Sequence, residues 1–308
     1  MKRPEPSLES RALGAYLGLA VGDALGATVE FMTAGEIRQQ YGELRDIVGG
    51  GWLRLKAGAV TDDTQMSLAL GAAILESGGW DLGNIAEHWA AWLKSKPIDV
   101  GNTCRRGITR YLHDGSLATP YSDGDAGNGA LMRNLPTILY AFRDPARLDR
   151  LAIEQAQLTH NHPFSDAATV CFARAIGEIL RGAETGDDWR SRLQKIRANA
   201  TLLVDQHRQF RYEPYPKRAS AYVVDTVQTV LHAFFATDSF ESCLIHTVNL
   251  GGDADTTGAI AGMLAGAHYG VEAIPGRWLK KLDARVRAEV GGQALALLAL
   301  GAAAGLDS

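Results

Sequence analysis

The sequence predicts a protein built almost entirely of α-helices. In segment after segment, apolar residues recur at the three- and four-residue spacing of an amphipathic helix, and the alternating pattern of a half-buried strand is nearly absent. A Thr, Asp or Ser suited to an N-cap precedes several of these segments. We therefore expect helices at residues 68–75, 85–93, 170–180, 187–205, 219–235, 239–248, 256–268 and 278–303.

Two rows of glycine predict that an early helix packs closely on a late one. The first row is Gly14, Gly18, Gly22 and Gly26, and the second is Gly258, Gly262 and Gly266. A glycine every fourth residue removes the Cβ atoms from one helix face, so another backbone can approach it. Because glycine inside a helix costs about 1 kcal/mol relative to alanine, a packing gain must offset each row.

Composition restricts the class of protein. The 308 residues show no linker and no repeat, so we expect a single domain over 1–308. A net charge of −4 does not suggest a nucleic-acid partner. Three scattered cysteines and the polar start MKRPEPSLES favour a cytoplasmic protein. The apolar stretches 12–21 and 258–267 are shorter than the roughly 20 residues that cross a bilayer, so no intrinsic membrane segment is expected.

The least regular stretches are expected to be loops, and loops on a rigid scaffold often carry functional sites. They are residues 97–107, 119–130, 159–164 and 208–218.

Acidic residues gather at the expected helix starts. Asp23 and Glu30 stand seven residues apart and would share one face if a helix ran through both. Each acidic cluster alone is explained by helix capping. Together the clusters supply more carboxylates than capping needs, and oxygen ligands without cysteine suit two Mg²⁺ or Mn²⁺ ions. These carboxylates are Asp62, Asp63, Asp253, Asp255 and Glu30, with Thr61 beside the first pair.

Three further stretches have both a functional and a structural interpretation. GDAGNGALMR, residues 124–133, is suited to holding a diphosphate on its N–H groups, and equally to forming a tight turn. THNHP, residues 159–163, offers His160 for substrate contact or for satisfying backbone groups. RQFRYEPYPKR, residues 208–218, mixes cations and rings that suit a nucleotide, but such a run is more often a solvated loop.

In their order along the chain, GDALGATVEF, TDDT, GDAGNGALMR with THNHP, and GGDADTTGAIAG resemble the ADP-ribosylglycohydrolase family. The resemblance implies an all-α orthogonal helical bundle with a cleft that holds two divalent cations, Mn²⁺ or Mg²⁺. It implies that the metal ligands are Thr61, Asp62, Asp63, Asp253, Asp255 and Thr256. It also implies a mobile Glu30 beside the metals, and substrate contacts from Asp99, Asn102, Gly127, Asn128, His160 and Tyr212.

The implied activity is hydrolysis of the N-glycosidic bond between ADP-ribose and an arginine side chain. Asp62, Asp63 or Glu30 would take the proton from the attacking water, and Asp99 would steady the departing guanidine. The match is closest to the nitrogen-fixation branch of the family. That branch implies ADP-ribosylated dinitrogenase reductase as substrate, regulation by a PII-type nitrogen-signalling protein, and peripheral membrane recruitment through that partner.

Two other functions stay open from the sequence. A dinuclear phosphohydrolase acting on nucleotide-like substrates would need the same hard ligands and a phosphate-binding loop. A non-catalytic relative that only binds ADP-ribose would keep the fold without turnover.

Overall fold

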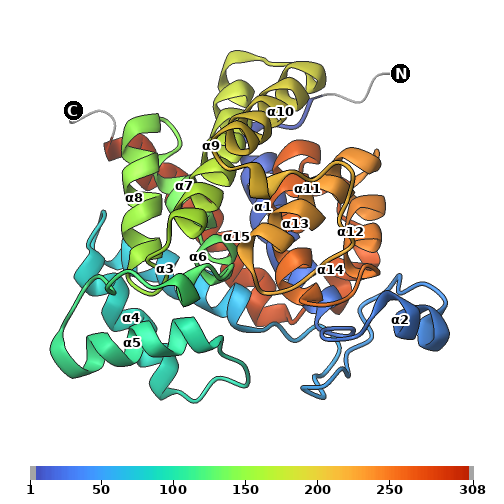
Figure 1. Cartoon of the computed structure of the whole chain (residues 1–308). Coiled ribbons are helices and arrows are strands. Elements are labelled where there is room, and N and C mark those ends of the chain that lie inside the picture. Colours follow the sequence, from blue (N-terminus) through green and yellow to red (C-terminus); the bar gives the residue numbers. More distant parts are fainter. Residues whose placement is uncertain (1–4, 305–308) are drawn as a thin grey trace.

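The computed structural model describes residues 5–304, and these residues form helices without any β-strand, as predicted (Figure 1). Three isolated antiparallel bridges are the extended pairings within this range. The elements are α1 Leu8–Gly26, α2 Ala34–Tyr41, α3 Asp62–Glu76, α4 Leu82–Lys94, α5 Asn102–Asp114, η1 Asp123–Asp125, α6 Gly129–Met132, α7 Leu135–Ala141, α8 Pro145–Gln157, α9 Pro163–Thr185, α10 Trp189–Gln206, η2 Arg208–Phe210, α11 Val223–Ala236, α12 Phe240–Val248, α13 Ala254–Tyr269, η3 Val271–Ala273, α14 Gly276–Lys281 and α15 Ala284–Ala304.

The antiparallel pair α1–α13 forms the centre of the molecule. Both helices are buried along almost their whole length, and their contact is the most extensive between helices of the described chain. The two glycine rows face each other there, which confirms the predicted close packing. A Cβ atom at Gly18 would lie 2.3 Å from the carbonyl oxygen of Gly262, and one at Gly262 would lie 2.0 Å from that of Gly18.

The other helices pack around this pair. α11 and α12 contact α13, α15 contacts α1, and α3 contacts α4 and α15, an arrangement that can be followed in Figure 1. α4 and α5 lie together at one edge of the molecule, and α9 and α10 extend from the opposite edge. The end of α1 and the start of α13 lie against each other, since a Cβ atom at Gly26 would lie 2.0 Å from the carbonyl oxygen of Ala254.

Seven of the eight expected helices are present as single elements, and two expectations need correction. The segment 278–303 is divided, because Asp283 accepts hydrogen bonds from the N–H groups of Arg285 and Val286 and so starts α15 anew. The expected loop 97–107 ends at Gly101, and α5 begins at Asn102. The buried face of α5 is only Cys104, Gly107 and Ile108, too sparse to give a clear periodic signal.

α15 is the one helix within residues 5–304 that is long and apolar enough to cross a membrane. A helix is expected here from the sequence, within residues 278–303, but its apolar length is not, because alanine and glycine separate its leucines. The length and apolar composition of one helix do not by themselves indicate a membrane segment, since core helices of globular proteins share both properties. One face of α15 packs on α1, α3 and α7. Gln293 on this face accepts a hydrogen bond from the Tyr16 hydroxyl and donates one to the carbonyl of Leu68.

The glycine contact predicts a large loss of stability for Gly18→Ala. The added methyl group would overlap the carbonyl of Gly262, and such overpacking costs about 3 kcal/mol or more when backbone cannot move away. The free energy of unfolding from urea titration measures the loss.

Gly292→Ala is the matched control, since no atom lies within 4 Å of a Cβ placed there. It should keep or raise stability, by up to about 1 kcal/mol from helix propensity. Equal stability of the two variants would contradict the assigned role of the glycine rows.

Candidate functional site

A short backbone pairing brings Glu30 to the start of α13. The Phe31 N–H donates to the carbonyl of Gly252 at 2.7 Å, and the Gly252 N–H donates to Met32 at 2.8 Å. Thr33 and Gly251 form an antiparallel bridge next to them. The helix does not run through both Asp23 and Glu30, so the two do not share one helix face: α1 ends at Gly26 and Glu30 lies in the turn that follows.

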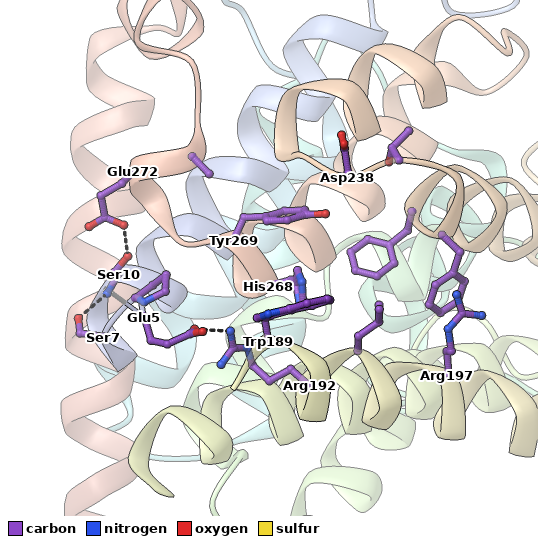
Figure 2. Close-up of a pocket in the computed structure, with 16 residues that line it drawn as sticks. Glu5, Ser7, Ser10, Trp189, Arg192, Arg197, Asp238, His268, Tyr269 and Glu272 are labelled. Atoms are coloured by element: carbon purple, nitrogen blue, oxygen red, sulfur yellow. Dashed lines mark hydrogen bonds and ion pairs between the residues drawn. The ribbon is translucent and has the colours of Figure 1, made fainter. Parts of the chain in front are cut away.

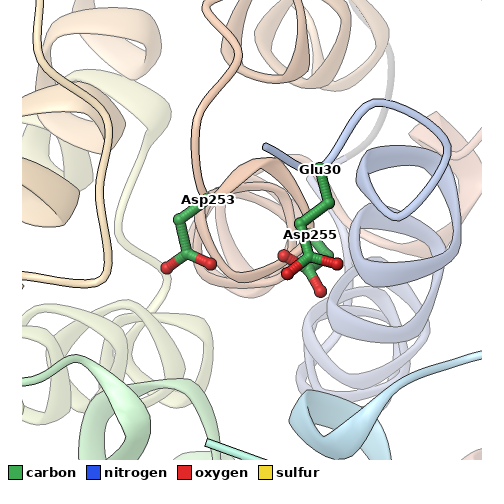
Figure 3. A group of neighbouring side chains, drawn as sticks. All are labelled: Glu30, Asp253 and Asp255. Atoms are coloured by element: carbon green, nitrogen blue, oxygen red, sulfur yellow. The ribbon is translucent and has the colours of Figure 1, made fainter. Parts of the chain in front are cut away.

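Glu30, Asp253 and Asp255 form a buried acidic group at this junction. One carboxylate oxygen of each lies within 4.8 Å of the others. In Figure 3, Glu30 and Asp255 lie side by side and Asp253 approaches from the other side of the helix start. Asp253 occupies the N-cap position of α13 but makes no side-chain capping bond. Capping therefore does not account for this carboxylate.

The start of α3 adds Asp62 and Asp63 to the group. The Thr256 hydroxyl lies 3.4 Å from Asp63 Oδ2, which connects α13 to α3. The Gly101 N–H donates to Asp62 Oδ2 at 3.0 Å. The N-termini of α3 and α13 thus both point at the carboxylates, and the positive ends of helix dipoles favour negative charge there.

The electrostatics of the group call for added positive charge. Within residues 5–304, no Lys, Arg or His forms an ion pair with any of these five carboxylates. Asp63 Oδ1 is buried and has no hydrogen-bond partner. An uncompensated buried charge costs several kcal/mol, so these residues fit a site for hard divalent cations.

Without bound metal, the carboxyl groups hold their protons more tightly than usual. Burial, aided by the charges of Asp99 and its acidic neighbours, raises the pKa of Glu30 to about 8, although a hydrogen bond from Trp52 opposes the shift. Burial and the charge of Asp99 raise the pKa of Asp62 to about 7. Burial first, then neighbouring acids, places the pKa values of Asp63 and Asp255 well above their usual range. A divalent cation would reverse these shifts.

The glycine-rich loop lies against Asp253. The Asn128 side chain donates to Asp253 Oδ2 and also to the Thr226 hydroxyl. The loop is fixed to the start of α11, because the Asn128 N–H donates to Ala221 at 3.0 Å and the Val223 N–H donates to Ala126 at 2.9 Å. Asn128 is thereby held at the acidic group, and its substrate contact stays a prediction.

His160 packs under the same loop. A Cβ atom at Gly127 would lie 3.1 Å from His160 Nε2, so glycine permits this close approach. The Thr159 hydroxyl lies 2.7 Å from His160 Nδ1 and accepts a hydrogen bond from the buried Arg133. Burial, with the nearby charge of Arg133, places the pKa of His160 well below its usual range, so the ring is neutral. The structure thus brings His160 and Gly127 together.

The remaining expected residues lie farther out. Asp99 is half-buried, and its charge acts on Glu30 and Asp62. Asn102 is exposed on the first turn of α5. Tyr212 stacks on Phe235, with ring centroids 5.8 Å apart, near the end of α11 that is farther from the glycine-rich loop. The structure therefore does not bring Tyr212 to the carboxylates, and its substrate contact stays a prediction.

Sequence reasoning named Asp23 but missed its contacts at this site, and it missed Trp52 altogether. Asp23 accepts hydrogen bonds from the N–H and hydroxyl groups of both Thr61 and Thr64, and so caps α3 from another helix. Burial raises the pKa of Asp23 to about 6. Trp52 Nε1 donates to Glu30 Oε2 at 2.6 Å. No local pattern reveals either contact, because 38 and 22 residues separate the partners.

A cavity of about 830 Å³ lies at the other end of the α1–α13 pair (Figure 2). It is lined by Ser10 near the start of α1, by His268 and Tyr269 at the end of α13, and by Trp189 of α10. The thirteen residue-to-residue steps from Ser10 to Asp23 on α1 span roughly 20 Å at a rise of 1.5 Å each. None of the residues expected at the site lines this cavity, so it is separate from the acidic group.

Comparison with known proteins identifies the relatives of the chain. The sequence profile of the ADP-ribosylglycohydrolase family matches residues 4–305. The chain is 59% identical over 302 residues, 98% of this chain and 99% of the other, to the ADP-ribosyl-[dinitrogen reductase] glycohydrolase of Rhodospirillum rubrum. It is 32% identical over 291 residues, 91% of this chain and 76% of the other, to the ADP-ribosylarginine hydrolase Tri1 of Pseudomonas putida.

A solved structure gives the same result at the level of the fold. A chain described as an ADP-ribosylglycohydrolase-related protein complex superposes with a TM-score of 0.80 and 37% sequence identity, covering 96% of this chain and 99% of that one. Together with the buried acidic group, these matches show that the chain belongs to the ADP-ribosylglycohydrolase family.

Proposed function

We propose that this protein hydrolyses the N-glycosidic bond that joins ADP-ribose to an arginine side chain of a modified protein. The observation that carries the proposal is the meeting of five buried carboxylates from three distant segments, without a cation from the described chain. The 59% identity to a Rhodospirillum rubrum enzyme named for ADP-ribosyl-[dinitrogen reductase] supports dinitrogenase reductase as the target. Both observations favour a hydrolase over a purely structural relative.

The residues of the chain suggest how a substrate would be held. The ribose would lie against Asp253 and Asp255, with its hydroxyls directed at the carboxylate group. The diphosphate would lie on the loop that carries Gly127 and Asn128, whose backbone is fixed by α11. Neutral His160 beneath the loop adds no charge and would orient the substrate through a hydrogen bond. Holding water and ribose C1 in this geometry lowers the entropic part of the barrier.

Two bound Mn²⁺ or Mg²⁺ ions would polarise the ribose hydroxyls and lower the pKa of a bound water. Their proposed ligands are Thr61, Asp62, Asp63, Asp253, Asp255 and Thr256. Asp62, Asp63 and Glu30 are the candidates for accepting the proton of the attacking water. Asp99 is half-buried and its charge acts on Glu30, so we propose that it steadies the departing guanidinium. The carboxylates would stabilise positive charge on the sugar ring.

Regulation forms part of the proposal. The resemblance to the nitrogen-fixation branch implies control by a PII-type nitrogen-signalling protein and peripheral recruitment to a membrane through that partner. We also propose that residues 1–308 form a single domain.

Asp255→Ala should lose metal binding and hydrolysis together. Asp255 lies within reach of Glu30, Asp253 and Asp63, so its loss breaks the shared ligand set. We expect turnover of ADP-ribosylarginine to fall at least 1000-fold under saturating Mn²⁺, while far-ultraviolet circular dichroism stays helical. Isothermal titration calorimetry measures the affinity for Mn²⁺.

Asp238→Ala is the control, because Asp238 is an exposed acid at the separate cavity. It should bind Mn²⁺ and turn over substrate as the unaltered protein does. Full activity in Asp255→Ala would refute the ligand assignment.

Metal-free protein should lose stability as pH rises. Unfolded carboxyl groups titrate near pH 4, while in the folded state the pKa is about 7 for Asp62 and about 8 for Glu30. The folded state therefore binds more protons between these values, and the stability present below pH 4 is lost as pH rises through 7 and 8. We expect Mn²⁺ to raise the melting temperature more at pH 8 than at pH 5.5.

Asp62→Asn provides the comparison, since it removes one of these protons. The difference between the Mn²⁺-induced shifts at the two pH values should shrink in this variant. An equal shift at both pH values in the unaltered protein would contradict the linkage between proton and metal binding.

The reaction itself is tested with three substrates. We expect Mn²⁺-dependent release of ADP-ribose from modified dinitrogenase reductase and from ADP-ribosylarginine, with free ADP-ribose left intact. Cleavage of free ADP-ribose to AMP and ribose phosphate would instead identify a phosphohydrolase. Binding of ADP-ribose without turnover of any substrate would identify a non-catalytic relative.

A further inference from the structure

Phe31 and Trp52 form an exposed aromatic pair beside the acidic group. Their side chains are 63% and 54% exposed, the highest values among the large apolar side chains of the described chain apart from Tyr121 and Ile98. The ring centroids lie 5.4 Å apart, and the Trp52 indole N–H reaches Glu30. We infer that this Phe31–Trp52 surface binds the polypeptide around the modified arginine. The inference rests on the proposed function and adds a protein-recognition site to it.

The backbone around Trp52 holds this surface in a defined conformation. Residues 42–61 connect α2 to α3 without regular structure, and loops of this length in compact domains are usually functional. Gly49, Gly50 and Gly51 have φ values of 72°, 87° and 66°, a left-handed backbone conformation that glycine adopts readily. Trp52 follows them directly. A Cβ atom at Gly51 would lie 2.3 Å from the carbonyl of Ala27, so the loop lies tightly on the turn before Glu30.

Phe31 is held outward by its own backbone. Its φ of 63° is strained for an aromatic residue, and the hydrogen bond from its N–H to Gly252 fixes it there. Strain of this kind persists where the surroundings enforce it and gathers at functional sites. A shallow hollow of about 450 Å³ continues from Phe31 along α2, lined by Met32, Glu36, Gln39 and Gln40.

The residues that contact the acidic group on its two sides indicate which part of the substrate binds at the Phe31–Trp52 surface. Asn128 and the glycine-rich loop contact Asp253, whereas Trp52 contacts Glu30. With the diphosphate on the loop, the arginine leaves on the side of Glu30. The polypeptide that carries this arginine would then extend over Phe31 and the hollow. Exposed aromatic side chains are also the usual anchors of protein interfaces.

Phe31→Ala tests the inference, because Phe31 donates no side-chain hydrogen bond to the carboxylates. We expect kcat/KM for ADP-ribosylated dinitrogenase reductase to fall about tenfold, mainly through KM, as is typical when an interface anchor is truncated. Turnover of ADP-ribosylarginine should stay within about twofold of the unaltered protein. Phe31→Gly should behave alike, and since glycine accepts the positive φ, this second variant guards against misfolding.

Trp189→Ala is the matched control, an aromatic residue that is 51% exposed at the separate cavity. It should act on both substrates as the unaltered protein does. An equal loss on both substrates in the Phe31 variants would place the ADP-ribosylarginine itself, rather than the surrounding polypeptide, on the rings and overturn the inference. Unchanged kinetics on the modified protein, or the same loss in Trp189→Ala, would also overturn it. If the unaltered protein turned over neither substrate, the proposed function itself would fail.

Discussion

The repulsion among buried carboxylates is the constraint on which the rest of the structure depends. Five acids gather where two helices begin, and their pKa values rise because burial and mutual repulsion disfavour their charge. A fold accepts such a group only if rigid surroundings hold it and a cation compensates it. Asp23 illustrates the support: buried and facing four donor groups of Thr61 and Thr64, it fixes the first turn of α3. The charge balance and the rigidity of the scaffold are therefore parts of one requirement.

The scaffold meets that requirement by bringing two backbones into contact. Where the glycine rows of α1 and α13 meet, no side chain separates the helices, so the end of α1 and the start of α13 are held together by direct backbone contact. The 31–33 and 251–252 segments then pair immediately beyond the helices. Glu30 reaches Asp255 through this junction. The position of the acidic group follows from backbone packing rather than from side-chain conformations alone.

The sequence predicted the parts of this arrangement that are local. Helical spacing identified most helices, and the four-residue glycine period identified the central contact, because both depend on near neighbours. It failed where distant segments decide the outcome. Glu30 lies beyond the end of the helix that carries Asp23, Asp23 caps α3, and Trp52 donates a hydrogen bond to Glu30. None of these contacts can be predicted from the residue types near one position of the sequence. The ordered acidic motifs located the carboxylates through resemblance, whereas Tyr212 lies on Phe235, away from them.

The facing glycine rows also limit how this protein can change over evolutionary time. Most core contacts tolerate a larger residue on one side if a smaller one appears opposite. Here both partners are already the smallest residue, so no second change can compensate for a gain at Gly18, Gly22 or Gly262. The centre of the molecule is thus closed to paired substitution, and new properties must arise in the segments around it, such as α10 or the long connection before α3.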